Sequence, residues 1–111
     1  MDNLVSIITP CYNSELYIED CVNSVIAQSY DKWEMIIVDD CSSDSSLEKI
    51  MLFSDIDSRI RIIKLEENHG AAVARNIALE DANGSFIAFL DADDFWEPLK
   101  LERQINFMKK N

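Results

Sequence analysis

Three carboxylates follow directly on a short apolar run near residue 90. Residues 86–90 are Phe-Ile-Ala-Phe-Leu, which is typical of a strand buried on both faces, and Asp91, Asp93 and Asp94 come right after them. Open α/β sheets bind ligands at the carboxyl ends of their strands. Alternate residues of an extended segment share a side, so Asp91 and Asp93 can converge on one cation while Asp94 points elsewhere. The alternative is that these acids only end a strand and cap the next helix.

Two further apolar runs are followed by polar or aromatic side chains. Asp39 and Asp40 come after the run at 35–38, and Tyr12 comes shortly after the run at 4–8. If the strands are parallel, all three loops emerge at one edge of the sheet. A stacking ring, acceptor carboxylates and a metal-binding pair are what a nucleoside diphosphate needs. The alternatives are a rim position for Tyr12 and turn or cap roles for the acids, and for Asp44 we favour the cap.

Strand and helix signals alternate along the chain. The strands are predicted at 4–9, 33–38, 60–65 and 85–90, and the helices at 13–28, 44–53, 70–82 and 99–109. Pro10 has no N–H for a ladder hydrogen bond, so the first strand is predicted to end there. This βαβαβαβα order predicts an α/β fold with a mostly parallel, doubly wound sheet.

Composition sets the outer limits. A chain of 111 residues that is 48% hydrophobic can bury one core, so residues 1–111 are predicted to form one domain or part of one. The net charge of -11 disfavours nucleic acid and anionic membranes as partners. With no apolar run of membrane-spanning length and no signal peptide, a cytoplasmic protein is predicted. The cysteines, Cys11, Cys21 and Cys41, form no C-x-x-C pair and are predicted to be reduced thiols.

Four blocks of the sequence together resemble the family 2 glycosyltransferases. The blocks are TPCYN at 9–13, VDDCSSD at 38–44, NHGAAVARN at 68–76 and FLDADD at 89–94. The resemblance implies the nucleotide-binding half of a GT-A (Rossmann-like) fold. It also implies an inverting transfer from a nucleotide-diphosphate sugar, usually a UDP-sugar, to a carbohydrate or glycolipid acceptor, with Mn²⁺ or Mg²⁺. The full-length protein would then work at the inner face of the membrane.

The resemblance assigns roles around the base of the nucleotide. It implies that Pro10 and Tyr12 flank the base, that Asp40 accepts a hydrogen bond from it, and that Asp39 lies beside it.

The resemblance also assigns the diphosphate end. It implies that Arg75 belongs to the segment lining the donor site. Asp91 and Asp93 match the D-x-D motif, whose last acid contacts the metal and whose first acid lies near the ribose or sugar. Two positions depart from the family: Cys41 and Ala78 stand where Gly is common, which bears on the nucleotide-binding turn.

The acceptor side of the reaction is not assigned to any residue here. The resemblance covers the first half of the family's catalytic domain, so we expect the general base beyond Asn111 and this chain to be an inactive fragment. Glu97 and Glu102 are interpreted as structural, and Trp33, Phe95 and Trp96 as packing residues, with the alternative that Phe95 and Trp96 border an acceptor groove. The alternatives are a non-catalytic sugar-nucleotide-binding module, a phospho-acceptor receiver domain and a dinucleotide-binding domain, although G-x-G-x-x-G is absent.

Overall fold

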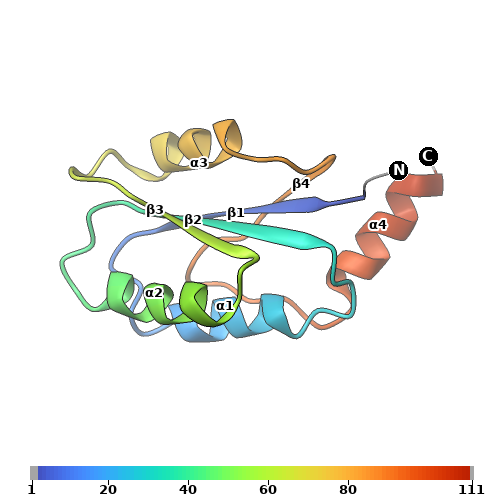
Figure 1. The fold of residues 1–111 in the computed structure, drawn as a ribbon, viewed down its shortest axis with the longest axis horizontal. Coiled ribbons are helices and arrows are strands. Elements are labelled where there is room, and N and C mark those ends of the chain that lie inside the picture. Colours follow the sequence, from blue (N-terminus) through green and yellow to red (C-terminus); the bar gives the residue numbers. More distant parts are fainter. Residues whose placement is uncertain (1–2, 111) are drawn as a thin grey trace.

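The computed structural model describes residues 3–110 and consists of alternating strands and helices (Figure 1). The strands are β1 (Val5–Cys11), β2 (Trp33–Asp39), β3 (Ile60–Lys64) and β4 (Phe86–Phe89). The helices are α1 (Ile18–Ile26), α2 (Ser46–Ile56), α3 (Ala71–Glu80) and α4 (Lys100–Lys110). This order confirms the predicted alternation.

All four described strands are parallel and lie in the order β3-β2-β1-β4. The chain runs from β1 outward through β2 to β3, and then returns through α3 to β4 on the other side of β1. α1 and α2 cover one face of the sheet and α3 covers the other (Figure 1). The predicted doubly wound α/β fold is therefore confirmed, and its topological switch point lies between β1 and β4.

The core lies on both faces of β1 and β2, because alternate residues of a strand point to opposite faces. Ile7 belongs to the cluster beneath α1 and α2, whereas its neighbour Ile8 packs beneath α3. Ala74 and Ala78 on α3 are fully buried against the sheet. Small side chains at these positions allow the helix to lie close to the strands.

β1 continues through Pro10 to Cys11, so the prediction that Pro10 ends the strand is wrong. Backbone groups of successive strand residues point alternately to the two neighbouring strands. The carbonyl of Ile8 accepts from the N–H of Leu90 after β4, and the carbonyl of Cys11 accepts from the N–H of Asp40 after β2. The missing N–H of Pro10 therefore points to the β4 side, where strand pairing has already ended at Ile8.

β4 is a short strand at the edge of the sheet. The prediction that it is buried on both faces is wrong. Ile87 is 39% exposed and Phe89 53% exposed. Both residues are in register with β1 residues, Ser6 and Ile8, on the α3 side of the sheet. α3 packs over β1 and β2, so that face of β4 is left uncovered.

The first two helices begin later than predicted. The carbonyl of Ser14 accepts from the N–H groups of Tyr17 and Ile18, so one turn precedes α1. Asp44 lies before α2, and its Oδ1 accepts from the N–H of Ser46 at 2.9 Å, as expected of a cap. None of the helices within residues 3–110 is long and apolar enough to cross a membrane.

Candidate functional site

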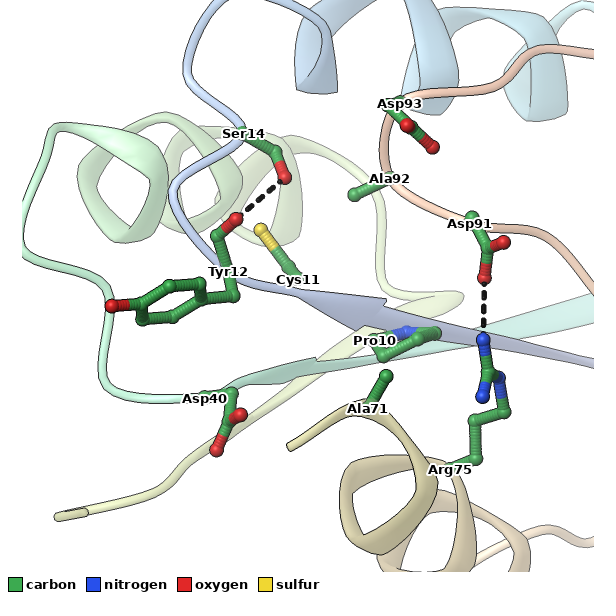
Figure 2. A pocket seen from close by; sticks show the side chains of 10 residues that line it. All are labelled: Pro10, Cys11, Tyr12, Ser14, Asp40, Ala71, Arg75, Asp91, Ala92 and Asp93. Carbon is green, nitrogen blue, oxygen red and sulfur yellow. Dashed lines mark hydrogen bonds and ion pairs between the residues drawn. The ribbon is translucent and has the colours of Figure 1, made fainter. Parts of the chain in front are cut away.

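An open cavity of about 250 Å³ lies at the carboxyl edge of the sheet, at the switch point between β1 and β4 (Figure 2). The loops after β1, β2 and β4 meet there with the start of α3, as the parallel topology predicts. Its lining residues are Pro10, Cys11, Tyr12, Ser14, Asp40, Ala71, Arg75, Asp91, Ala92 and Asp93. Six of the seven predicted site residues are thus brought together, and the seventh, Asp39, is not among the lining residues.

Tyr12 stands directly after β1, on the same side of the cavity as Asp40 (Figure 2). Its side chain is half exposed, so the ring does not belong to the core. The loop is held from the main chain instead, because the Ser14 hydroxyl donates to the carbonyl of Tyr12 at 3.1 Å. An exposed ring fixed through its backbone is available to stack on a planar ligand.

Asp40 is almost fully buried and is already engaged by the backbone before α3. Its Oδ1 accepts from the N–H of His69 and its Oδ2 from the N–H of Gly70, both at 2.8 Å. Its carbonyl accepts from Nδ2 of Asn68 at 3.2 Å. Asp40 therefore fixes the entry into α3, and each carboxylate oxygen keeps a second lone pair for another donor. The side chain of His69 is exposed and does not line the cavity.

Asp39 shapes the loop after β2. Its Oδ1 accepts from Oγ of Ser42 at 2.7 Å, and its Oδ2 from the N–H of the same residue at 3.2 Å. Ser42 in turn accepts from the N–H of Asn13, whose Oδ1 accepts from the N–H of Ser43 at 2.8 Å. The loops after β1 and β2 are thus joined through Asn13, the last residue of the TPCYN block. Its φ of 46° is a conformation that Asn tolerates well.

Arg75, Asp91 and Asp93 form the opposite side of the cavity (Figure 2). Nη2 of Arg75 lies 3.1 Å from Oδ1 of Asp91, and both side chains are partly exposed. The N–H of Asp94 donates to the carbonyl of Asp91 at 3.0 Å, so residues 91–94 form a turn. The extended geometry assumed for this segment is wrong, but Asp91 and Asp93 both face the cavity.

The donor set fits a divalent cation that shares its coordination with a ligand. Mg²⁺-type sites use one or two carboxylates and complete their shell with phosphate oxygens and water. Asp91 and Asp93 provide such carboxylates, and residues 3–110 contain no cluster of three or more potential ligands. Burial raises the pKa of Cys11 to about 11 and that of Cys21 to about 12. Thiolates are soft ligands, whereas Mg²⁺ and Mn²⁺ prefer carboxylate oxygens, so the cation is assigned to the acids and not to these cysteines. Both are free cysteines, as predicted.

A second cavity of about 510 Å³ adjoins the first and shares Arg75 and Asp91 with it. Phe95 and Trp96 line it. Trp96 packs against the core and Trp33 lies within it, as predicted, but Phe95 is 68% exposed and is not a packing residue. The turn that begins at Asp91 carries this ring outward instead.

The two departures from the family's glycines have different structural settings. Cys41 has a φ of 61°, in the left-handed region where glycine is favoured, so the backbone retains the conformation that the family's residue suits. Ala78 is fully buried between α3 and the sheet, where a single methyl group is accommodated.

The family model described as Glycosyl transferase family 2 matches residues 6–111. The chain belongs to this family. It is 58% identical over 105 residues to the putative teichuronic acid biosynthesis glycosyltransferase TuaG of Bacillus subtilis (strain 168), covering 95% of this chain and 42% of the relative. It is 52% identical over 110 residues to the Escherichia coli UDP-Glc:alpha-D-GlcNAc-diphosphoundecaprenol beta-1,3-glucosyltransferase WfgD, covering 99% of this chain and 43% of the relative. The chain thus spans about two fifths of the length of these curated relatives.

Solved structures of glycosyltransferases share the fold. The S. aureus TarS 1-349 complex with UDP-GlcNAc matches with a TM-score of 0.90 and 34% identity, over 96% of this chain and 31% of that one. The mannosyltransferase PcManGT from Pyrobaculum calidifontis, in complex with GDP-Man and Mn²⁺, matches with a TM-score of 0.82 and 27% identity, over 97% of this chain and 32% of that one. These neighbours confirm the expected GT-A fold. Membership of the family argues against the receiver-domain and dinucleotide-binding alternatives.

Proposed function

We propose that this chain is the donor-binding part of an inverting glycosyltransferase. The donor is a UDP-hexose, the acceptor is a hydroxyl group of a carbohydrate or glycolipid, and the reaction depends on Mn²⁺ or Mg²⁺. One observation carries the proposal: an aromatic ring and a buried acid face a guanidinium and two carboxylates across one cavity at the switch point. The complex of TarS with UDP-GlcNAc and the donor named for WfgD support the choice of a UDP-sugar.

The residues divide the donor between two sides of the cavity. Tyr12 stacks on the base, and a free lone pair of Asp40 accepts its imide N–H, while Pro10 completes this wall. On the other side the guanidinium of Arg75 donates to the diphosphate, for which its fork geometry is suited. We propose that Asp39 supports the base site indirectly. Its carboxylate accepts two hydrogen bonds from Ser42 and so holds the loop that begins at Asp40.

Asp91 and Asp93 would hold the divalent cation beside Arg75. A bound cation supplies positive charge against the negative charge that develops on the departing diphosphate. Because Arg75 already pairs with Asp91, Asp93 is the carboxylate with the freer oxygen atoms. We therefore propose Asp93 as the principal protein ligand and Asp91 as the residue shared between Arg75 and the donor.

The general base is assigned to none of the acids after Asp93. Oδ1 of Asp94 accepts from the N–H of Phe95, and Glu97 is paired with Arg103 at 2.6 Å. We propose that the acceptor hydroxyl is deprotonated by a residue beyond Asn111. The expected cytoplasmic location, at the inner membrane face for a glycolipid acceptor, is part of the same proposal.

Thermal unfolding with UDP and MnCl₂ tests the donor site. Because the cation and the diphosphate share coordination in this proposal, the two ligands together are expected to raise the melting temperature more than the sum of their separate effects. A ligand at 100 times its Kd stabilises the folded state by about 2.7 kcal/mol. Asp93→Asn should abolish this synergy. Asp55→Asn is the matched control, because Asp55 is exposed near the end of α2 and away from the cavity lining. An unchanged synergy in Asp93→Asn would contradict the metal assignment.

A further inference from the structure

A row of side chains along α1 grips the main chain that follows β4. Cys21 and Ser24 lie on α1 and Gln28 lies just past its end, so they continue one helical face at spacings of three and four residues. Their partners in the segment 91–101 are all backbone groups. None of the three side chains lines the donor cavity.

The first two contacts hold the start of the segment. Sγ of Cys21 donates to the carbonyl of Asp91 at 3.6 Å. Oγ of Ser24 accepts from the N–H of Trp96 at 3.1 Å and donates to the carbonyl of Cys21 at 2.7 Å. The acidic turn is thus tied to α1 on both sides of Asp93.

Gln28 holds the end of the segment. Its side-chain Nε2 donates to the carbonyl of Glu97 at 2.7 Å and to that of Ser24 at 3.0 Å. Its Oε1 accepts from the N–H of Leu101 at 3.0 Å, in the first turn of α4, where N–H groups have no partner within the helix. The residue is only 7% exposed, so losing these bonds would leave buried polar groups unpaired.

A side-chain contact completes the grip beside Gln28. The N–H of Ser29 donates to the carbonyl of Pro98 at 3.0 Å, and its hydroxyl donates to Oε1 of Glu102 at 3.2 Å. This accounts for Glu102 as a structural residue, as the sequence suggested.

Most side chains of the acidic turn are exposed, although Ala92 in the turn and Leu101 at the end of the segment are buried in the core, and Trp96 packs against it. The side chains of the segment are exposed at Asp93, Asp94, Phe95 and Glu97. α1, by contrast, is anchored by side chains that are fully buried in the core, namely Ile18, Cys21, Val22 and Val25. The exposed residues of the turn therefore depend for their position on these few core contacts together with the hydrogen bonds to the α1 row.

We propose that Gln28, assisted by Ser24, is a positioning residue that sets the place of the Asp91 and Asp93 carboxylates for the cation. This inference rests on the proposed function, because it concerns the metal-dependent part of donor binding. It assigns to α1 a role in the site although α1 contributes no group to the cavity. Partners that orient metal ligands from a distance affect metal binding strongly.

Calorimetric titration of UDP into the full chain, with and without MnCl₂, tests the role. Gln28→Ala should lower the Mn²⁺-dependent gain in UDP affinity by roughly 10-fold or more, and leave UDP affinity without metal unchanged. Ser24→Ala removes fewer bonds and should lower the gain less, so the test does not depend on one variant folding. Gln104→Ala changes the same residue type on α4 and should keep the full gain.

A second control separates position from stability. Val25→Ala opens a cavity in the core behind α1, so it should lower the melting temperature and keep the Mn²⁺ gain. A full gain in Gln28→Ala and Ser24→Ala would overturn the positioning role and leave the proposed function in place. No Mn²⁺ gain in the unmodified chain would overturn both.

Discussion

At the scale of single residues, the two sides of the cavity have different relations to the fold. Asp40 is buried and bonded to two backbone N–H groups, so changing it alters the entry into α3 as well as the site. Tyr12 is half exposed and held only through its main chain. Its side chain can therefore be changed with little effect on folding, which makes it the better probe of base recognition.

Tyr12→Ala should weaken UDP and leave pyrophosphate unaffected. Loss of stacking on a base costs on the order of 1 to 3 kcal/mol, and pyrophosphate has no base to stack. Competition binding with both ligands measures the difference. Tyr17→Ala is the matched control, because Tyr17 is similarly exposed and does not line the cavity. Equal losses for UDP and pyrophosphate would show that Tyr12 supports the loop and not the base.

The residues that could be predicted from the sequence are those that follow apolar runs. Asp91 and Asp93 are predictable because an apolar run stops against them, and the parallel strand order places them at the same edge of the sheet as Tyr12. The bonds of Asp40 to residues 69 and 70 could not be predicted, because they join loops separated by a whole strand and helix. The left-handed backbone at Cys41 is not indicated by cysteine itself, and its one signal in the sequence is that glycine is common at this position in the family.

At the scale of elements, the sequence predicts where the helices and strands lie along the chain, but not how exposed their side chains are. The alternation of strands and helices follows from hydrophobic spacing, which acts along the chain. Whether β4 is covered depends on where α3 lies across the sheet, and α3 packs over β1 and β2. The continuation of β1 through Pro10 is not predictable for a similar reason, because it depends on whether the strand on the side of the missing N–H has already ended.

The opposite edge of the sheet contains a buried polar network that joins β1, β2, β3 and the start of β4. The carboxylate of Glu34 accepts from Ser6, from the backbone and side chain of Asn83, and from Arg61 at 2.6 Å. The N–H of Gly84 donates to Oγ of Ser6 at 2.8 Å. A Cβ at Gly84 would lie 2.7 Å from the carbonyl oxygen of Leu4 and from the backbone nitrogen of Ser6, so only glycine fits this approach.

Glu34 should make stability depend on pH in the acid range. Burial alone would raise its pKa, but the hydrogen bonds from Ser6, Asn83 and Arg61 outweigh burial and lower the pKa from about 4.5 to about 2. A depressed pKa gives stability that is full above pH 4.5 and is lost as the pH falls through 2. The difference corresponds to about 3 kcal/mol.

Urea unfolding between pH 7 and pH 2 measures this contribution. Glu34→Gln should lower stability at pH 7 and flatten the pH dependence below 4.5. Glu48→Gln, a change at an exposed residue of α2, should leave both unaltered. An acid transition of the same depth in Glu34→Gln would assign the pH dependence to other carboxylates.

At the scale of the whole molecule, the two edges of the sheet have separate roles. The Glu34 network closes the amino edge, while the donor cavity lies at the carboxyl edge, where parallel strands leave their loops free. α1 supports the carboxyl edge, because it packs in the core and its side chains bond the segment after β4. Changes at the amino edge are therefore expected to act on stability and not on donor binding.

The same division predicts that residues 1–111 bind a UDP-hexose without transferring its sugar. Every carboxylate lining the two cavities already has a role in the proposal or a partner in the structure. Asp40 holds the entry to α3, Asp91 pairs with Arg75, and Glu97 pairs with Arg103. With Asp93 assigned to the cation, a base would have to be Asp94, whose Oδ1 accepts from the N–H that follows it.

Incubation of the chain with labelled UDP-sugars, MnCl₂ and candidate acceptors, followed by chromatography, measures transfer. We expect binding by calorimetry and no glycoside product. Slow release of UDP is compatible with this outcome, because water can take the place of an acceptor at an uncovered donor site. Asp94→Asn is the informative variant: if glycoside does form and this change abolishes it while UDP affinity is kept, the base lies within this chain, immediately after the D-x-D motif.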